Sequence, residues 1–189
     1  MPSLDDAVAA IDAANAQDPT LEDGQPAALL YGQRMSAEQD RLFPEASDVL
    51  RIACRGQHIE RWRLPRSDYP MDRPGYLRWR QEQGRRHAER IAGIMADAGY
   101  PAGDQDRART LLTKQGIKRD AEVQALEDVI CFTFIRWYLG DFMAEVPDEK
   151  LPRIIEKTAR KMSPEGRARA LEEFPMPDAL AQHFRDEPA

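Results

Sequence analysis

Apolar residues recur every three or four positions through most of the chain, a spacing that predicts α-helices rather than strands. The predicted helices cover residues 4–17, 46–62, 76–98, 104–114 and 120–142. Another helix is expected to begin after Pro26, and two or three more lie between 147 and 189. No sustained alternation of apolar and polar residues marks a strand. The pattern therefore predicts an all-α fold of about eight helices.

Two of these helices each carry a histidine on the face that the apolar pattern marks as buried. In the helix over 46–62, the inward positions are Leu50, Cys54, His58 and Trp62. In the helix over 76–98, His87 shares a face with Ile91 and Ile94. The proline-rich segment between the two helices has a stiff, irregular path, so it is a candidate wall of a site.

The helix over 120–142 is the predicted centre of the fold. Its segment from Val129 to Leu139 is apolar on nearly every side, which is typical of a buried helix. Glu127 and Asp128 enter the helix just before this segment. Burying a carboxylate without a partner is costly, so we expect each to have an arginine, another donor or a metal ion nearby.

Length and composition favour one soluble domain. The chain has 189 residues, of which 42% are hydrophobic and 32% are charged, which is enough for a sizeable core. We expect a single domain over 1–189, with an N-terminal helical extension (1–45), a core that bears the site (46–145) and C-terminal helices (146–189). An acidic N-terminus and the lack of a long apolar run predict a cytoplasmic protein that does not bind membranes.

Positive charge is concentrated in one segment. Residues 51–91 contain 11 arginines and 5 acidic residues, whereas the net charge of the whole chain is −6. The overall charge argues against general nucleic-acid binding, but the local excess beside two imidazoles indicates a site that receives a small anion. The four main candidate anion-binding residues are Arg55, Arg61, Arg66 and Lys118, and Lys114 is a further candidate.

The same histidines are candidate metal ligands. His58, His87 and Asp128 would form a mononuclear site for a divalent Fe, Zn, Mn or Ni ion with open positions for water or substrate. Glu127 would then be a catalytic general base or a partner of a ligand. The alternatives stay open: each histidine can be a core residue that bonds to the backbone, and each carboxylate can pair with an arginine.

Several segments resemble a known family. The runs Ala53–His58, Pro65–Arg73, Gly75–Arg80 and Lys118–Val129 are similar to the domain-of-unknown-function family 4202, and the resemblance covers about residues 46–171. Some members carry a glutamyl-tRNA synthetase label. Lys161-Met162-Ser163 matches the start of a synthetase signature loop, but the partner histidine signature and a Rossmann strand pattern are absent, so we reject that activity.

The chain also resembles, more distantly, the HD-domain proteins, which are all-α and include metal-dependent phosphohydrolases. That resemblance implies an HD-like arrangement around a central buried helix. It would make His58 the early histidine, His87 the histidine that opens a helix and Asp128 the late aspartate. The chain departs from the pattern because Ala88 follows His87 where a His-Asp pair would stand. This departure implies one metal ion, or a site that binds an anion without turnover.

Two functions are therefore expected. The first is a small metal-dependent enzyme, a hydrolase rather than an oxygenase, that acts on a small phosphate- or carboxylate-bearing substrate. The second is a non-catalytic helical protein that binds an anionic ligand or an acidic partner.

Overall fold

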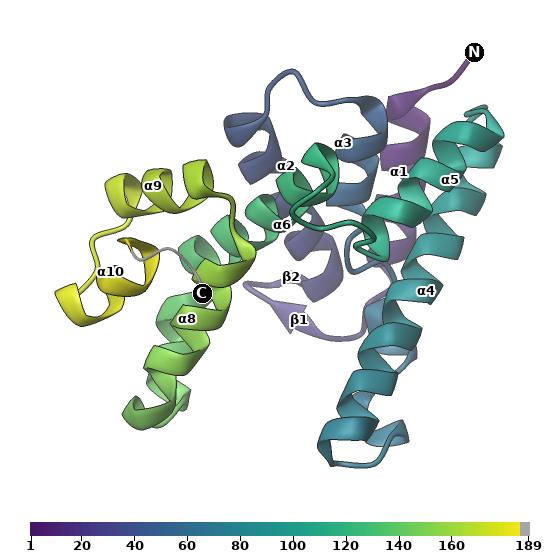
Figure 1. Cartoon of the computed structure of the whole chain (residues 1–189). Helices are drawn as coiled ribbons and strands as arrows, with labels where there is room; N and C mark the ends of the chain where they lie inside the picture. Colours follow the sequence, from purple (N-terminus) through teal and green to yellow (C-terminus); the bar gives the residue numbers. More distant parts are fainter. Residues whose placement is uncertain (186–189) are drawn as a thin grey trace. The chain divides into compact units, whose positions relative to one another are not determined.

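The computed structural model describes residues 1–185 and is built from α-helices (Figure 1). Within these residues there are ten α-helices and one antiparallel pair of very short strands, β1 (Leu21–Glu22) and β2 (Gln25–Pro26). The all-α prediction is confirmed. The chain forms two compact units, a first unit over 1–116 and a second unit over 117–189. None of the described helices combines the length and apolar character needed to cross a bilayer.

The first unit contains five helices. They are α1 (Leu4–Asn15), α2 (Ala27–Leu42), α3 (Asp48–Arg55), α4 (Arg73–Asp97) and α5 (Ala102–Leu112). The short helix α3 contacts α1, α2 and α5, and α4 packs along α5. Side-chain caps begin several of these helices: the Asp72 carboxylate, for example, accepts a hydrogen bond from the Gly75 N–H at the start of α4. Gly99, with φ +85°, allows the sharp turn between α4 and α5.

The prediction of one helix over 46–62 is wrong, because α3 ends at Arg55. Gly56 follows it at a close contact with α4, where a Cβ atom would lie 2.1 Å from Cδ1 of Ile91. The chain then turns through His58 and continues as a 3₁₀ turn, η1 (Arg61–Arg63). His58 therefore lies in a turn beyond the helix. A second 3₁₀ turn, η2 (Arg66–Asp68), precedes α4.

The second unit contains the other five helices. They are α6 (Ala121–Thr133), α7 (Leu139–Glu145), α8 (Leu151–Lys161), α9 (Pro164–Glu173) and α10 (Asp178–Arg185), with a π-helical turn η3 (Phe134–Tyr138) and a 3₁₀ turn η4 (Asp148–Lys150) between them. The fully buried side chain of Phe132 on α6 packs against Phe174, with 5.5 Å between the ring centroids. Helix α8 packs against α6 and α10.

The prediction of one continuous buried helix over 120–142 is also wrong. The α-helix stops at Thr133, and the π-helical turn η3 separates it from α7. A π turn holds more residues than an α turn, so it rotates the positions that follow it. Trp137, which the apolar pattern placed inside, is 42% exposed.

Candidate functional site

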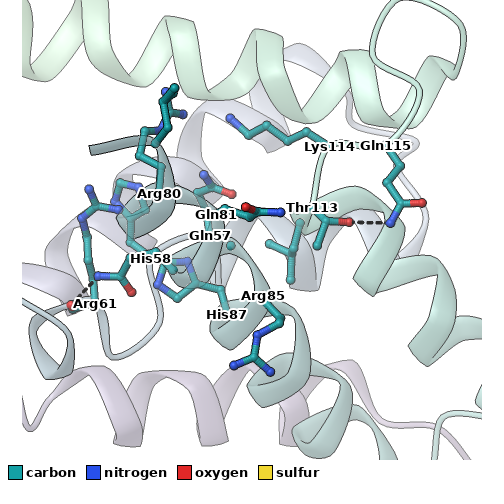
Figure 2. Close-up of a pocket in the computed structure, with 14 residues that line it drawn as sticks. Gln57, His58, Arg61, Arg80, Gln81, Arg85, His87, Thr113, Lys114 and Gln115 are labelled. Atoms are coloured by element: carbon teal, nitrogen blue, oxygen red, sulfur yellow. Dashed lines mark hydrogen bonds between the residues drawn. The ribbon is translucent and has the colours of Figure 1, made fainter. Parts of the chain in front are cut away.

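A cavity of about 630 Å³ opens in the first unit. Its wall comes from the turn after α3, the first half of α4 and the end of α5 (Figure 2). Four cationic side chains line it: Arg61, Arg80, Arg85 and Lys114. Two imidazoles, His58 and His87, and four glutamine side chains also line it, but no aspartate or glutamate does. We call this cavity the histidine pocket.

The two predicted histidines lie next to each other in this pocket. The His58 ring stacks on Tyr31 of α2, with 4.2 Å between the ring centroids and 15° between the planes. The centroids of His58 and His87 are 6.0 Å apart. Helix α4 presents His87, and the turn that Gly56 begins presents His58. The structure therefore brings the two histidines together, and their role in a functional site stays a prediction.

Both imidazoles are held in the neutral form. Desolvation, followed by the positive charge of Arg61, lowers the pKa of His58 well below its ordinary value. Desolvation and the charges of Arg61 and Arg86 lower the pKa of His87 to about 3. At pH 7 the two rings therefore add no charge to the pocket, and each offers one N–H donor and one nitrogen lone pair.

The tautomer of His87 follows from its hydrogen bonds. A bond to the Gln57 backbone raises the pKa of His87, as a bond does when the ring donates to a carbonyl group. The Nε2 atom is buried and has no hydrogen-bond partner among the described residues. The proton of neutral His87 is therefore assigned to Nδ1, and Nε2 carries the lone pair.

Helix α4 also fixes the position of Arg61. The Gln83 side chain donates to the backbone carbonyls of Arg61 and Leu64, at 2.9 and 3.0 Å. Trp79 Nε1 donates to the Leu64 carbonyl at 2.9 Å, and its ring lies under the Arg61 guanidinium, 4.7 Å from Cζ to the ring centroid. These contacts hold the half-buried Arg61 guanidinium at the pocket, and desolvation lowers the pKa of Arg61.

Of the four predicted anion-binding residues, only Arg61 lines the histidine pocket. Arg55 forms a bidentate pair with Asp12, at 2.7 and 2.6 Å. Arg66 donates to backbone carbonyls of its own loop, including that of Tyr69 at 2.9 Å. Lys118 belongs to the second unit, where it donates to the Met162 carbonyl at 2.7 Å. A role in ligand binding for these three residues stays a prediction.

Two of the four lining cations, Arg80 and Arg85, were not assigned to the site from the sequence, whereas Lys114 was a further candidate. Arg80 lies seven positions before His87, so two helical turns place both on one face of α4, and this spacing was the available signal. Arg85 also pairs with Glu82 on the surface of the same helix. Lys114 follows the end of α5 in a left-handed conformation, with φ +56°, and no periodicity marks such a position.

The predicted carboxylates lie in the second unit. Asp128 accepts hydrogen bonds from the Ser163 N–H at 2.8 Å, the Ser163 hydroxyl at 2.5 Å and Gln124 Nε2 at 3.0 Å. Burial raises the pKa of Asp128, although these three donors act in the opposite direction. Glu127 is 1% exposed, and its carboxylate lies 3.6 Å from the Lys161 amine.

The described residues contain no cluster of three histidine, cysteine, aspartate or glutamate side chains that could hold a metal ion. The predicted set of His58, His87 and Asp128 spans the two units, so it stays a prediction, as does the role of Glu127 as a general base.

Comparison with known proteins gives one match. A family model described as a domain of unknown function (DUF4202) matches residues 5–183. No curated protein and no solved structure shows significant similarity. The HD-like resemblance therefore stays a prediction. The match covers nearly the whole chain, and the protein belongs to the DUF4202 family.

Proposed function

We propose that this protein binds a small anionic molecule, with a phosphate or carboxylate group, in the histidine pocket. One observation carries the proposal: every charged side chain that lines the pocket is cationic, and none of the lining residues is acidic. The volume of about 630 Å³ is within the range of small-molecule sites.

The arginines of the pocket are suited to an anion. In the described part of the chain, neither Arg61 nor Arg80 forms an ion pair with a carboxylate, and each lies near an aromatic ring, that of Trp79 or Tyr76. Cations that share a concave surface repel one another, and a bound anion removes that repulsion. A guanidinium group also binds phosphate or carboxylate through two parallel hydrogen bonds.

Replacing Arg80 with glutamine is expected to weaken the binding of inorganic phosphate about tenfold, the loss typical of one charge-assisted hydrogen bond. Isothermal titration calorimetry of the wild type and the variant, at low and constant ionic strength, measures this change. Adding salt should weaken phosphate binding to the wild type more steeply than to the variant, because one cationic contact is gone.

Arg78→Gln is the matched control. Arg78 lies on the same helix, carries the same charge and is exposed like Arg80, but it does not line the pocket. This variant should bind phosphate like the wild type. Equal weakening by the two substitutions would mean that only net charge matters, and a wild type that binds no phosphate would refute the proposal.

A metal-dependent hydrolase that acts on the same anion is the second candidate. Two neighbouring neutral imidazoles, with the lone pair of His87 Nε2 unused, favour it, since neutral imidazole is a common ligand of Zn and of divalent Fe, Mn and Ni. A bound ion would lower the pKa of its water for hydrolysis.

Metal analysis distinguishes the two candidates. If the hydrolase proposal is correct, protein that has been supplemented with Fe, Zn, Mn or Ni and then dialysed retains one ion per chain, and both His58→Ala and His87→Ala lose it. Wild-type protein that stays metal-free after this treatment but binds phosphate would leave anion binding without a metal as the function.

A further inference from the structure

Two buried hydrogen-bond acceptors lie on one face of α4 in the wall of the histidine pocket. Gln83 and His87 are four residues apart, so one helical turn separates them. Their side chains are nearly inaccessible to solvent, with 2% and 5% of each residue exposed. Both residues line the pocket.

The chemistry of each acceptor is defined by its other hydrogen bonds. The Gln83 amide nitrogen donates to the carbonyls of Arg61 and Leu64, which identifies the remaining atom, Oε1, as an oxygen. His87 bonds to the Gln57 backbone and its Nε2 has no partner among the described residues, so the ring proton is assigned to Nδ1 and Nε2 carries the lone pair. Neither Oε1 of Gln83 nor Nε2 of His87 receives a hydrogen bond from any residue within 1–185.

Such a pair of atoms is unusual, because nearly all buried polar atoms in folded proteins have a partner. An inorganic phosphate ion would satisfy the cations of the pocket, but its only O–H groups belong to the same small group that the arginines bind, so it brings no separate donors for these two atoms. A ligand that brings O–H groups as well as negative charge would pair with both the cations and the two buried acceptors.

We propose that the ligand of the histidine pocket is a phosphate ester of a polyhydroxylated compound, of the sugar phosphate class. This inference rests on the proposed function: the phosphate group lies against Arg61 and Arg80, and two hydroxyl groups donate to Gln83 Oε1 and His87 Nε2. Residues one turn apart on a helix have Cβ atoms about 5–6 Å apart, so both side chains are within the span of two hydroxyl groups on the same small molecule.

Calorimetric titration with ligands of equal charge tests the proposal. The sugar ligands are D-ribose 5-phosphate and D-glucose 6-phosphate, and the matched ligands without hydroxyls are pentyl phosphate and hexyl phosphate. We expect at least one sugar phosphate to bind about tenfold or more tightly than the alkyl phosphate of the same chain length, because only its hydroxyls satisfy the buried acceptors.

The possible outcomes separate the two proposals. Alkyl phosphates that bind as tightly as both sugar phosphates would overturn the hydroxyl inference while leaving the anion pocket in place. The same conclusion would follow if inorganic phosphate bound but neither sugar phosphate did. If no phosphate compound bound, the proposed function and this inference would both fail.

Variants of His87 show whether the preference depends on the acceptor. His87→Leu should lose the tenfold preference, whereas His87→Gln, whose side chain also offers an acceptor oxygen, should retain much of it. Arg78→Leu, on the exposed side of α4 and outside the pocket, should keep the preference of the wild type. Circular dichroism spectra and melting curves establish that each variant is folded. A preference that survives in His87→Leu would refute the role of this acceptor.

Discussion

Asp128→Ala is expected to destabilise the second unit by about 3 kcal/mol, the cost of leaving several buried donors without an acceptor. The carboxylate of Asp128 binds the backbone N–H and the hydroxyl of Ser163, together with the Gln124 amide. The same Ser163 hydroxyl accepts from the Gly166 N–H as the N-cap of α9. The carboxylate therefore joins α6 to the start of α9, and alanine would remove that junction.

Urea unfolding followed by circular dichroism measures this effect. Asp128→Asn keeps one acceptor oxygen and nearly the same shape, so it should lose only about 1 kcal/mol. Asp141→Ala, which removes an exposed carboxylate of the same unit, should change the free energy of unfolding by less than about 0.5 kcal/mol. If the carboxylate served mainly as a metal ligand, Asp128→Ala would leave the metal-free protein as stable as the wild type or more so.

Lowering the pH from 7 to 5 is expected to cost the first unit about 2 kcal/mol through His87 alone. An unfolded chain takes up a proton on this imidazole below a pH of about 6.5, whereas the folded pKa is about 3. The unfolded state therefore binds more protons across this range, so the free energy of unfolding falls with the pH. His58 acts in the same direction, because its pKa is also lowered.

Comparison of the wild type with His87→Gln isolates this contribution. The variant has no imidazole at this position, so between pH 7 and 5 it should lose about 2 kcal/mol less than the wild type. Urea unfolding of each protein at pH 7 and pH 5 measures how much its free energy of unfolding changes between the two pH values. The same loss in both proteins would show that His87 becomes protonated in the folded state near its ordinary pKa.

Local signals in the sequence predicted most helix limits. Ser163 followed by Pro164 is a local helix-start signal, and α9 starts there with the Ser163 hydroxyl as its cap. Gly99 is a local stop signal after the predicted helix over 76–98, and α4 ends just before it. These features depend on residues that are close in sequence, which is why the amino-acid pattern alone predicts them.

The two wrong helix predictions have a different origin. The apolar periodicity continues beyond Gly56, and a single glycine within a helical pattern is tolerated, so the pattern predicted one helix over 46–62. In the structure the helix ends before Gly56, whose backbone lies against Ile91, and a contact between such distant parts of the chain leaves no periodic signal in the sequence. The apolar segment around Trp137 showed no signal for a π-helical turn, since each residue of that turn also suits an α-helix.

The sequence named both histidines of the candidate site, but it did not name Arg80 and Arg85 among the cations that line it. Buried faces follow from periodicity, so His87 was assigned to the interior of its helix. Arg55 and His58 would share a helix face only if one helix covered 46–62, but α3 ends at Arg55. Lys114 reaches the pocket from a turn after α5, and no pattern in one sequence relates that turn to α4.

The contact between Gly56 and Ile91 links the packing of the interior to the pocket. Gly56 immediately precedes the turn that carries His58, and Ile91 lies one helical turn beyond His87. A bulkier residue at position 56 would push the turn away from α4 and separate the two imidazoles. A change in the size of Gly56 or Ile91 would therefore alter fold stability and ligand recognition together. The sizes of these two residues are expected to evolve together.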